Sequence, residues 1–460
     1  MTWSVLKFGG SSVADANLWK TIQREVQVKL DQGHQPFLVL SALKNVSNLL
    51  EALLHQALAG VHIKAIFQLK ELHLRFAAEL GVNGETALQS YFDDLTDFCD
   101  EIYRQQTVTP KQHAQVLACG ELFSTVIGAN YLQNQGVNVF WMDCRAHLIA
   151  HNNRDLDEWH HYTSNQCDYS ESLDAKQMGC QSDQVIITQG FIAADEFGDT
   201  VLLGREGSDT SASYFAAKLR ANQLEIWTDV PGVFSINPRD ISEARQLSVM
   251  SYRQAELFSQ SGAKVLHPRA MAPVKEFSIP VRVKSTRLPE NPGTYIYLDD
   301  CAASVIGIAI EESVTWVRAN HLSQTTIEQL LALGFDRIEL DLSNANQCLL
   351  LYRHTEKHQP EDDQLSHKYS VMLESGYTLI TLLGSTHDGQ WIEDVKAHMS
   401  SQWKERTLAC FTNKELGIMS ILVNPNCSAE ITQQLHRGLI EENELSNEFG
   451  LSWSSIVSES

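Results

Sequence analysis

A lysine, two adjacent glycines and a hydroxyl residue follow a short apolar segment near the N-terminus: Lys7, Gly9, Gly10 and Ser11. Adjacent glycines let backbone N–H groups approach an anion without interference from a Cβ atom. Apolar residues at helical spacing over 18–30 predict a helix after this turn, with Asp15 as its cap, whose N-terminus attracts the same anion. The pattern is typical of a phosphate site, although an ordinary strand-turn-helix with a surface lysine is the alternative. The Gly-Lys-Ser/Thr order of a Walker loop is absent.

A second glycine-bracketed turn, at residues 204–209, precedes a helical segment over 212–219. Arg205 suits bidentate binding of a carboxylate. The backbone of Gly207 and the hydroxyl of Ser208 offer donors to an anion at a helix start, and Asp209 could orient a lysine or lie near a magnesium ion. The alternative is a helix start at which these side chains only satisfy backbone donors.

Further polar residues lie where strands or turns end. Thr228 and Asp229 end a strand, and the turn at Asn237-Pro238 presents Arg239. Residues of this kind suit the base, ribose and outer phosphates of a nucleotide, and they equally suit a plain loop. Two more candidates are Lys264 and Glu121. Each has a common structural role as the alternative, because a lysine between small residues is usually solvated and a glutamate at a helix start is usually a surface cap.

The elements that must position these residues alternate between strand and helix over the first 300 residues, which predicts an α/β domain. Expected strands end before polar residues, and ligands gather at the carboxyl ends of strands in such sheets. Helices are expected over 49–108 and 112–134. From about 301, shorter strands alternate with helical stretches such as 363–376 and 390–404, which suggests two βαββαβ-like modules. The expected strands are 37–40, 137–141, 185–188 and 224–227 in the first part, and 305–310, 314–317, 337–342, 348–352, 377–383 and 417–423 in the second.

Composition restricts the function further. The formal net charge of −22 disfavours non-specific nucleic-acid binding, because no basic field gathers phosphates. We find no apolar run long enough for a membrane span and no signal peptide at the N-terminus. The nine cysteines are scattered without zinc spacing, which favours reduced thiols, a cytoplasmic location and no metal site.

The motifs described above, and the order in which they follow one another along the chain, resemble those of the aspartokinases, which are amino-acid kinases. The resemblance covers residues 1 to about 297, and its finer features resemble the kinase half of bifunctional aspartokinase–homoserine dehydrogenases. It implies a three-layer αβα kinase domain over 1–300 and a tandem pair of α+β ACT modules over 301–460. The motifs that carry it are 7–13, 41–42 with 47–48, 120–121, 188–191, 204–209, 226–232 and 262–268.

The resemblance also implies a reaction, in which the ATP γ-phosphoryl group passes to the β-carboxylate of L-aspartate, the first step toward lysine, threonine and methionine. Lys7, Asp209 and Lys264 would be catalytic. Aspartate would bind to Ser47, Glu121, Arg205, Glu206, Gly207 and Ser208. ATP, brought with Mg²⁺, would bind to Lys7, Gly9, Gly10, Ser11, Thr228, Asp229, Phe234, Arg239, Lys264 and Val265.

Several residues depart from the family pattern. Position 206 is commonly glycine or asparagine, Phe234 replaces a tyrosine, and Asn237 replaces an aspartate. These changes keep open the alternative of a catalytically impaired regulatory subunit. A kinase of another amino-acid acceptor is a separate alternative. No Gly-x-Gly-x-x-Gly segment precedes Ser460, so we expect no homoserine dehydrogenase activity, in either a free-standing kinase or a trimmed piece of a longer protein. A homodimer through the ACT modules is expected, in preference to an amino-acid effector bound there.

Overall fold

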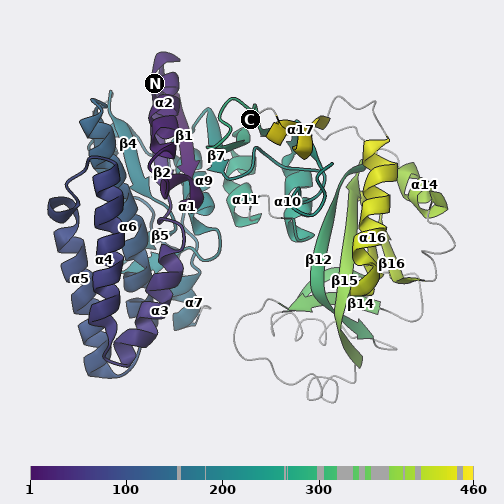
Figure 1. Ribbon diagram of the computed structural model, residues 1–460, viewed down its shortest axis with the longest axis horizontal. Coiled ribbons are helices and arrows are strands. Elements are labelled where there is room, and N and C mark those ends of the chain that lie inside the picture. Colours follow the sequence, from purple (N-terminus) through teal and green to yellow (C-terminus); the bar gives the residue numbers. More distant parts are fainter. Residues whose placement is uncertain are drawn as a thin grey trace. The chain divides into compact units, whose positions relative to one another are not determined.

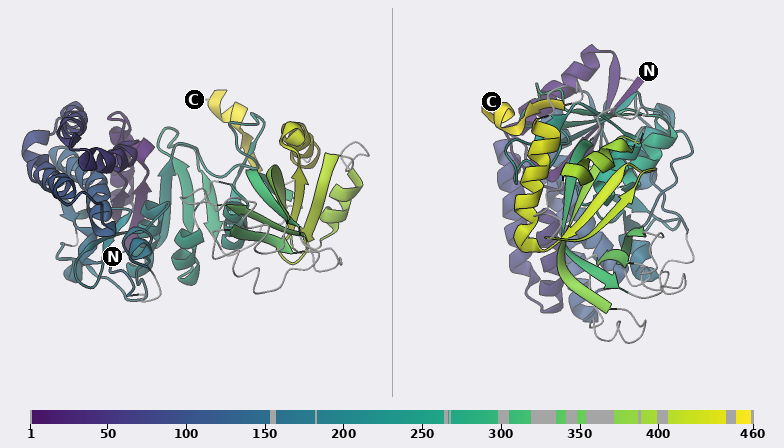
Figure 2. Two further views of the ribbon diagram at one scale, coloured as in Figure 1. Left: turned by 90° about the horizontal axis from the view of Figure 1, so that it is seen from below. Right: turned by 90° about the vertical axis from the view of Figure 1, so that its right-hand side faces the viewer.

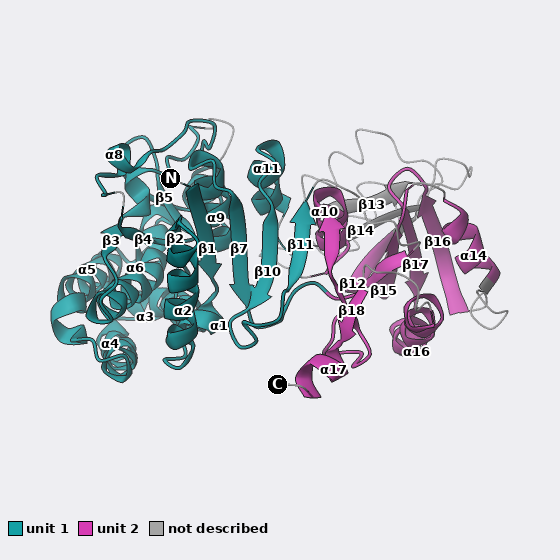
Figure 3. Cartoon of the chain, turned by 90° about the horizontal axis from the view of Figure 1, so that it is seen from above, with its two compact units in different colours: residues 1–233, 266–298 teal, residues 234–265, 299–460 magenta. Residues whose placement is uncertain are grey.

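The computed structural model describes residues 2–152, 157–181, 183–263, 266, 268–297, 305–318, 335–340, 348–353, 372–386, 389–398, 406–442 and 449–458. The chain forms two compact units, one of residues 1–233 with 266–298 and one of residues 234–265 with 299–460 (Figure 3). The sequence placed a domain boundary near residue 300. In the structure, residues 234–265 group with the C-terminal part of the chain.

A mainly parallel sheet forms the centre of the first unit, in the order β3-β4-β2-β1-β7-β10-β11. All neighbours in this series are parallel except β10 and β11. The expected strands of this part are therefore confirmed. The strands are β1 (Thr2–Phe8), β2 (His34–Leu40), β3 (Val139–Met142), β4 (Val185–Gln189), β7 (Gln223–Thr228), β10 (Val281–Ser285) and β11 (Thr294–Tyr297), with β5 (Ile192–Ala194) and β6 (Thr200–Leu202) as a separate pair.

Helices cover both faces of this sheet, as the three-layer fold requires. On one face, Gly128 of α6 lies against Trp19 of α2 and Leu40 of β2. Phe37 of β2 packs on Phe215 of α9, with ring centroids 4.7 Å apart. Because side chains alternate along a strand, Phe37 and Leu40 point to opposite faces. The helices are α1 (Gly10–Val13), α2 (Leu18–Asp31), α3 (Val46–Leu58), α4 (His62–Glu79), α5 (Gly84–Gln105), α6 (Pro110–Asn134), α7 (Glu158–Thr163), α8 (Ala175–Met178), α9 (Gly207–Lys218) and α11 (Pro268–Glu276), with a 3₁₀ turn η1 (Cys144–Ala146).

The long helices follow from the sequence directly. Thr109 and Gln112 form a reciprocal capping box at the start of α6, and Pro110 occupies the first turn, where no backbone donor is lost. Helices α4, α5 and α6 run side by side in Figure 1. The expected helical regions 49–108 and 112–134 are confirmed. Among the helices that the structure describes, none is long and apolar enough to cross a membrane.

The second unit contains an antiparallel sheet in the order β13-β14-β12-β15-β17-β16. Its core includes Trp316, Leu379 and Phe411, and α16 lies against β12 and β15 (Figure 2). The elements are β8 (Arg245–Leu247), β9 (Val249–Ser251), α10 (Tyr252–Gln260), β12 (Val305–Arg318), β13 (Phe335–Leu340), β14 (Cys348–Arg353), β15 (Met372–Gly384), α14 (Gln390–His398), β16 (Thr407–Asn413), β17 (Ile418–Val423), α16 (Pro425–His436), a π-helical turn η2 (Arg437–Glu441), β18 (Phe449–Ser452) and α17 (Trp453–Ser458).

Two expectations for this part change. The separate strands over 305–310 and 314–317 are one strand, β12, whose register shifts at a bulge where Ser313 has a φ of 62°. The helix expected over 363–376 is wrong at its end, because residues 372–376 begin β15 and pair with β12. The sheet supplies cross-strand partners that a local helical pattern cannot reveal.

A buried polar triad in the second unit connects segments distant in sequence. Ser235 Oγ lies 2.9 Å from His436 Nε2, and His436 Nδ1 lies 2.8 Å from Glu441 Oε1. The backbone N–H of Arg245 also donates to Ser235 Oγ. The arrangement has the order of a hydrolytic Ser-His-acid triad, but Ser235 and His436 are fully buried. Its role is therefore structural: it ties the segment after residue 234 to α16 and η2.

Candidate active site

Four parallel strands end at the same edge of the sheet, and their following residues are hydrogen-bonded to one another. The N–H of Ser41, after β2, donates to Phe8 O of β1 at 3.1 Å. The N–H of Gly190, after β4, donates to Leu40 O of β2 at 2.9 Å. The N–H of Gly9, after β1, donates to Trp227 O of β7 at 3.1 Å. These bonds bring the turns predicted at the strand ends into one place.

The Gly9-Gly10 turn packs directly on the turn that follows β2. A Cβ atom at Gly10 would lie 2.9 Å from Ala42 O, so a side chain there would push the two turns apart. Ser12 supports the turn from behind, because its hydroxyl donates to Trp227 O and accepts a hydrogen bond from Thr286 Oγ1 at 2.7 Å. The close approach of backbones explains the glycine.

The helix next to this turn differs from the expectation. A one-turn helix, α1, begins at Gly10, and α2 begins only at Leu18. Asp15 is not the cap of α2: Asn17 occupies the N-cap position, and its N–H donates to Asp15 Oδ1 at 3.0 Å. The apolar spacing over 18–30 correctly predicted α2 but carried no signal for the short turn before it.

A cavity of about 370 Å³ opens at this edge of the sheet, and most of the residues predicted to bind substrate line it. The predicted residues that line it are Lys7, Gly10, Ser47, Glu121, Arg205, Glu206, Gly207, Ser208 and Asp209. Sequence reasoning did not assign the other lining residues, Ser41, Ala42, Leu43, Lys44, Asn45, Phe191 and Gly204. Their position directly after strand ends, or in the already suspected 204–209 turn, was the available signal.

The charge of Lys7 is matched inside the cavity. Its Nζ lies 2.6 Å from Asp209 Oδ1, and the two side chains are only 11% and 12% exposed. The pair joins the end of β1 to the first turn of α9. The ion pair holds the Lys7 ammonium group at the cavity wall, and the catalytic role predicted for Asp209 stays a prediction.

Glu121 lies in the middle of α6, not at a surface helix start as in the alternative interpretation. It is 3% exposed, its Oε1 accepts the N–H of Ala42 at 3.1 Å, and its Oε2 has no partner among the described residues. Burial raises the pKa of Glu121 to about 8, against the opposing effects of backbone N–H donors and of Lys7. A buried, unpartnered carboxyl oxygen at a cavity wall is suited to binding a cation.

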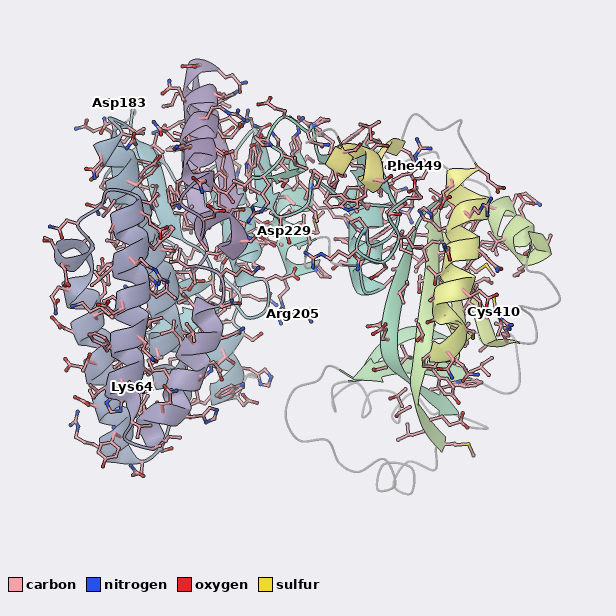
Figure 4. All side chains as sticks on the ribbon, in the orientation of Figure 1. Lys64, Asp183, Arg205, Asp229, Cys410 and Phe449 are labelled. Carbon is pink, nitrogen blue, oxygen red and sulfur yellow. The ribbon has the colours of Figure 1, made fainter. Side chains whose placement is uncertain are left out.

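The 204–209 turn contains a strained residue. Glu206 has a φ of 52°, in the left-handed region, and occupies the N-cap position of α9. Glycine and asparagine adopt this conformation most readily, so a glutamate here is strained. The side chains of Arg205 and Glu206 are exposed, and Figure 4 shows Arg205 projecting from the body of the first unit.

Phe191 also has left-handed geometry, with a φ of 69°. The N–H of Ile192 donates to Gly190 O at 2.8 Å, which closes a three-residue turn around Phe191. The Phe191 N–H donates to Ser211 Oγ at 2.9 Å, and its carbonyl accepts the N–H of Leu203. Surrounding structure therefore holds a bulky residue in a costly conformation against the cavity, a feature of functional sites.

Of the residues predicted to bind the nucleotide, fewer line the cavity than of those predicted to bind the amino acid. Gly9, Ser11, Thr228 and Asp229 belong to the first unit but do not line this cavity. Phe234 and Arg239 belong to the second unit, where the ring of Phe234 is 5% exposed and packs edge-on against Trp453. Lys264 and Val265 lie outside the described residues. The nucleotide roles of all these residues stay predictions.

Comparison with known sequences gives the family. The model of the amino acid kinase family matches residues 2–285. A bifunctional aspartokinase/homoserine dehydrogenase of Buchnera aphidicola is 32% identical over 308 residues, which are 65% of this chain and 37% of that protein. Lysine-sensitive aspartokinase 3 of Escherichia coli is 28% identical over 294 residues, which are 64% of this chain and 63% of that protein. The chain thus spans little more than a third of the bifunctional relative.

Comparison with solved structures gives the fold. Escherichia coli aspartokinase III, solved in complex with aspartate and ADP in its R-state, superposes with a TM-score of 0.78 at 23% identity. The superposition covers 95% of this chain and 99% of that one. The same enzyme in complex with lysine and aspartate, in its T-state, gives a TM-score of 0.75. The α/β kinase architecture expected from the sequence is confirmed.

The strain at Glu206 predicts an unusual response to glycine. Glu206→Gly should raise the free energy of unfolding by about 1 kcal/mol, because glycine adopts the left-handed conformation without steric cost. The matched control is Glu71→Gly on the exposed face of the right-handed helix α4, which should lower it by about 1 kcal/mol. Equilibrium chemical denaturation measures both. A loss of stability in both variants would contradict the strain.

Proposed function

Because the chain belongs to the amino acid kinase family, we propose that it is an aspartate kinase. It transfers the γ-phosphoryl group of ATP to the β-carboxylate of L-aspartate and releases 4-phospho-L-aspartate and ADP. The aspartokinase names of the relatives and the similarity of the fold support this proposal.

One observation carries the proposal: the cavity combines Lys7, Glu121 and Arg205. A free amino acid with an acidic side chain has one ammonium group and two carboxylates. Glu121 provides a buried oxygen for the ammonium group, and Arg205 suits bidentate binding of the α-carboxylate. Lys7 then remains available to contact the γ-phosphoryl group during its transfer. An N-acetylated acceptor would place no positive charge against Glu121, which disfavours that substrate class.

The proposed reaction needs no general base, because the attacking carboxylate is already ionised at neutral pH. Catalysis depends instead on positioning and on stabilising the charge that spreads over the transferred phosphoryl group. Lys7 supplies a fixed positive charge, because its Nζ is held 2.6 Å from Asp209 Oδ1. The backbone N–H groups at the starts of α1 and α9 add oriented dipoles, which cost little reorganisation.

Magnesium enters this proposal as part of the substrate MgATP. Within the described ranges, no group of three histidine, cysteine, aspartate or glutamate side chains could hold a metal ion. Asp209 is paired with Lys7, and Glu121 Oε1 accepts a backbone N–H. The phosphate oxygens would therefore supply much of the coordination of the ion.

The direct test is a coupled assay for ADP release with aspartate, glutamate and N-acetylglutamate as acceptors. Turnover with aspartate, at least tenfold above that with either competitor, supports the proposal. Preference for another acceptor would make the chain a different amino-acid kinase. Binding of MgATP without turnover of any acceptor would favour an impaired regulatory subunit, the alternative that Phe234 and Asn237 keep open.

For the second unit we propose dimerisation through two ACT-like modules. Its antiparallel sheet with helices α14 and α16 supports an α+β module of this kind. The sequence offers no counterpart of a glycine-centred effector loop at 321–334 or 340–348, and these residues lie almost entirely outside the described part of the chain. Titrating lysine, threonine and methionine into the kinase assay tests the preference for dimerisation alone. Inhibition by any of them would make this unit a feedback sensor.

Removal of Lys7 should affect turnover more than binding. We expect Lys7→Ala to lower kcat by about a thousandfold or more, because the fixed charge acts on the group in transfer. Steady-state kinetics measure kcat, and calorimetry measures the affinity for MgADP. Lys7→Ala with Asp209→Asn removes the unpaired buried carboxylate and controls for misfolding. If Lys7→Ala kept most of its turnover, the mechanism would be wrong.

The raised pKa of Glu121 predicts the pH dependence of aspartate capture. Below about pH 8 the carboxyl group of the empty site is mostly protonated, and the substrate ammonium must displace this proton. We therefore expect kcat/KM for aspartate to rise with pH up to about 8 and then to level off. Profiles at saturating ATP measure this rise.

Two variants test that Glu121 causes the rise. Glu121→Gln should raise the KM for aspartate and remove this limb of the profile, because the amide does not titrate. Glu79→Gln, on the exposed end of α4, should leave both unchanged. The same limb in Glu121→Gln would assign the titration to another group.

A further inference from the structure

Lys44 lines the cavity, although no pattern in the sequence indicated a role for it. It lies in the turn between β2 and α3, and its side chain is exposed. Its N–H donates to Gly10 O at 3.2 Å, and its Cα would lie 3.6 Å from a Cβ at Gly10. The main chain of Lys44 therefore packs on the Gly9-Gly10 turn, the part of the site that is suited to phosphate.

The geometry of this turn is fixed. The N–H of Val46 donates to Leu43 O at 2.9 Å, which closes the turn. Asn45, the N-cap residue of α3, has a φ of 70°, a conformation that asparagine tolerates better than most residues. Ser41 at the other end is bound to Phe8 O and accepts the hydroxyl of Ser124. Only the flexible side chain of Lys44 remains to be ordered by a ligand.

The charge of Lys44 is available. Lys7 is paired with Asp209, whereas Lys44 makes no ion pair with any described residue. The chain has 57 acidic residues and 35 lysines and arginines, so its charge is mainly negative and an anion in the cavity depends on local cations. An anionic ligand in the cavity would supply the missing partner.

The other cation without an ion-pair partner in the described part of the cavity is Arg205, from the turn before α9. The two cations thus come from different walls. Arg205 lies beside Gly207 and Ser208, the proposed binding residues of the amino acid, and Lys44 lies beside Gly10. We therefore expect Arg205 to contact a carboxylate of the amino acid and Lys44 to contact a phosphate.

Resting on the proposed kinase activity, we propose that Lys44 binds the γ-phosphoryl group of ATP as a further catalytic cation, in addition to Lys7 and the predicted Lys264. The P–O bond to the β-phosphate breaks as the bond to the aspartate carboxylate forms, with ADP as the leaving group. During this transfer the equatorial oxygens keep their negative charge, and two lysines contact them from β1 and from the turn after β2. Lys44 makes no bond and moves no proton.

Binding of two nucleotides tests this role without requiring turnover. We expect Lys44→Ala to weaken binding of the magnesium complex of the non-hydrolysable ATP analogue AMP-PNP by roughly 10- to 100-fold. Binding of MgADP, which has no γ-phosphoryl group, should change less than about twofold. Isothermal titration calorimetry measures both affinities. Lys44→Arg keeps the charge and should retain most of the affinity.

The matched control is Lys64→Ala, which removes the same charge from an exposed site on α4, away from Arg205 in Figure 4. It should change neither affinity, because a long-range effect of net charge is screened by salt. Melting curves of the three variants confirm that each is folded.

The possible failures are distinguishable. Equal effects of Lys44→Ala on both nucleotides, or no effect, would overturn the role of Lys44. An increased KM for aspartate with unchanged AMP-PNP binding would place Lys44 on the amino acid and overturn it as well. If the unaltered protein bound neither nucleotide, the proposed kinase activity would fail first, and the role of Lys44 with it.

Discussion

The ion pair between Lys7 and Asp209 joins the two halves of the candidate site. Lys7 is the penultimate residue of β1, and Asp209 lies in the first turn of α9, more than 200 residues later. At 2.6 Å and about 90% buried, the pair can form only if β1 and α9 meet as the three-layer fold requires. The remaining cavity walls, with Glu121, Arg205 and Lys44, surround this fixed point.

A second set of buried charges supports the site from behind. Lys29 of α2 and Glu225 of β7 form an ion pair at 2.7 Å, and the other oxygen of Glu225 accepts the indole N–H of Trp227. The ammonium group of Lys284 lies 4.3 Å from the Trp227 ring centre. Because the carbonyl of Trp227 accepts the Gly9 N–H, these contacts fix one anchor of the glycine turn. Removing one partner of such a pair would leave an uncompensated buried charge, which is strongly destabilising.

Strain gathers at the same place. Asn45, Phe191 and Glu206 line the cavity, and they are three of the seven non-glycine residues with positive φ in the described part of the chain. Such conformations persist only where neighbouring hydrogen bonds hold them, as Ser211 and Leu203 do at Phe191. The site therefore combines fixed backbone turns with side chains, such as Lys44 and Arg205, that a ligand can order.

The sequence by itself determined the αβα class, the long helices, the inner strands of the first unit and most of the residues that line the cavity. Local periodicity and glycine turns encode these features, and parallel strands bring their ends together. Tertiary structure alone decided three others: the burial that raises the pKa of Glu121 to about 8, the left-handed strain at Glu206 and Phe191, and the position of Lys44 at the cavity without an ion-pair partner among the described residues. Each depends on atoms contributed by segments distant in sequence, which no local pattern specifies. For the same reason, the start of β15 within an expected helix became visible only through its pairing with β12.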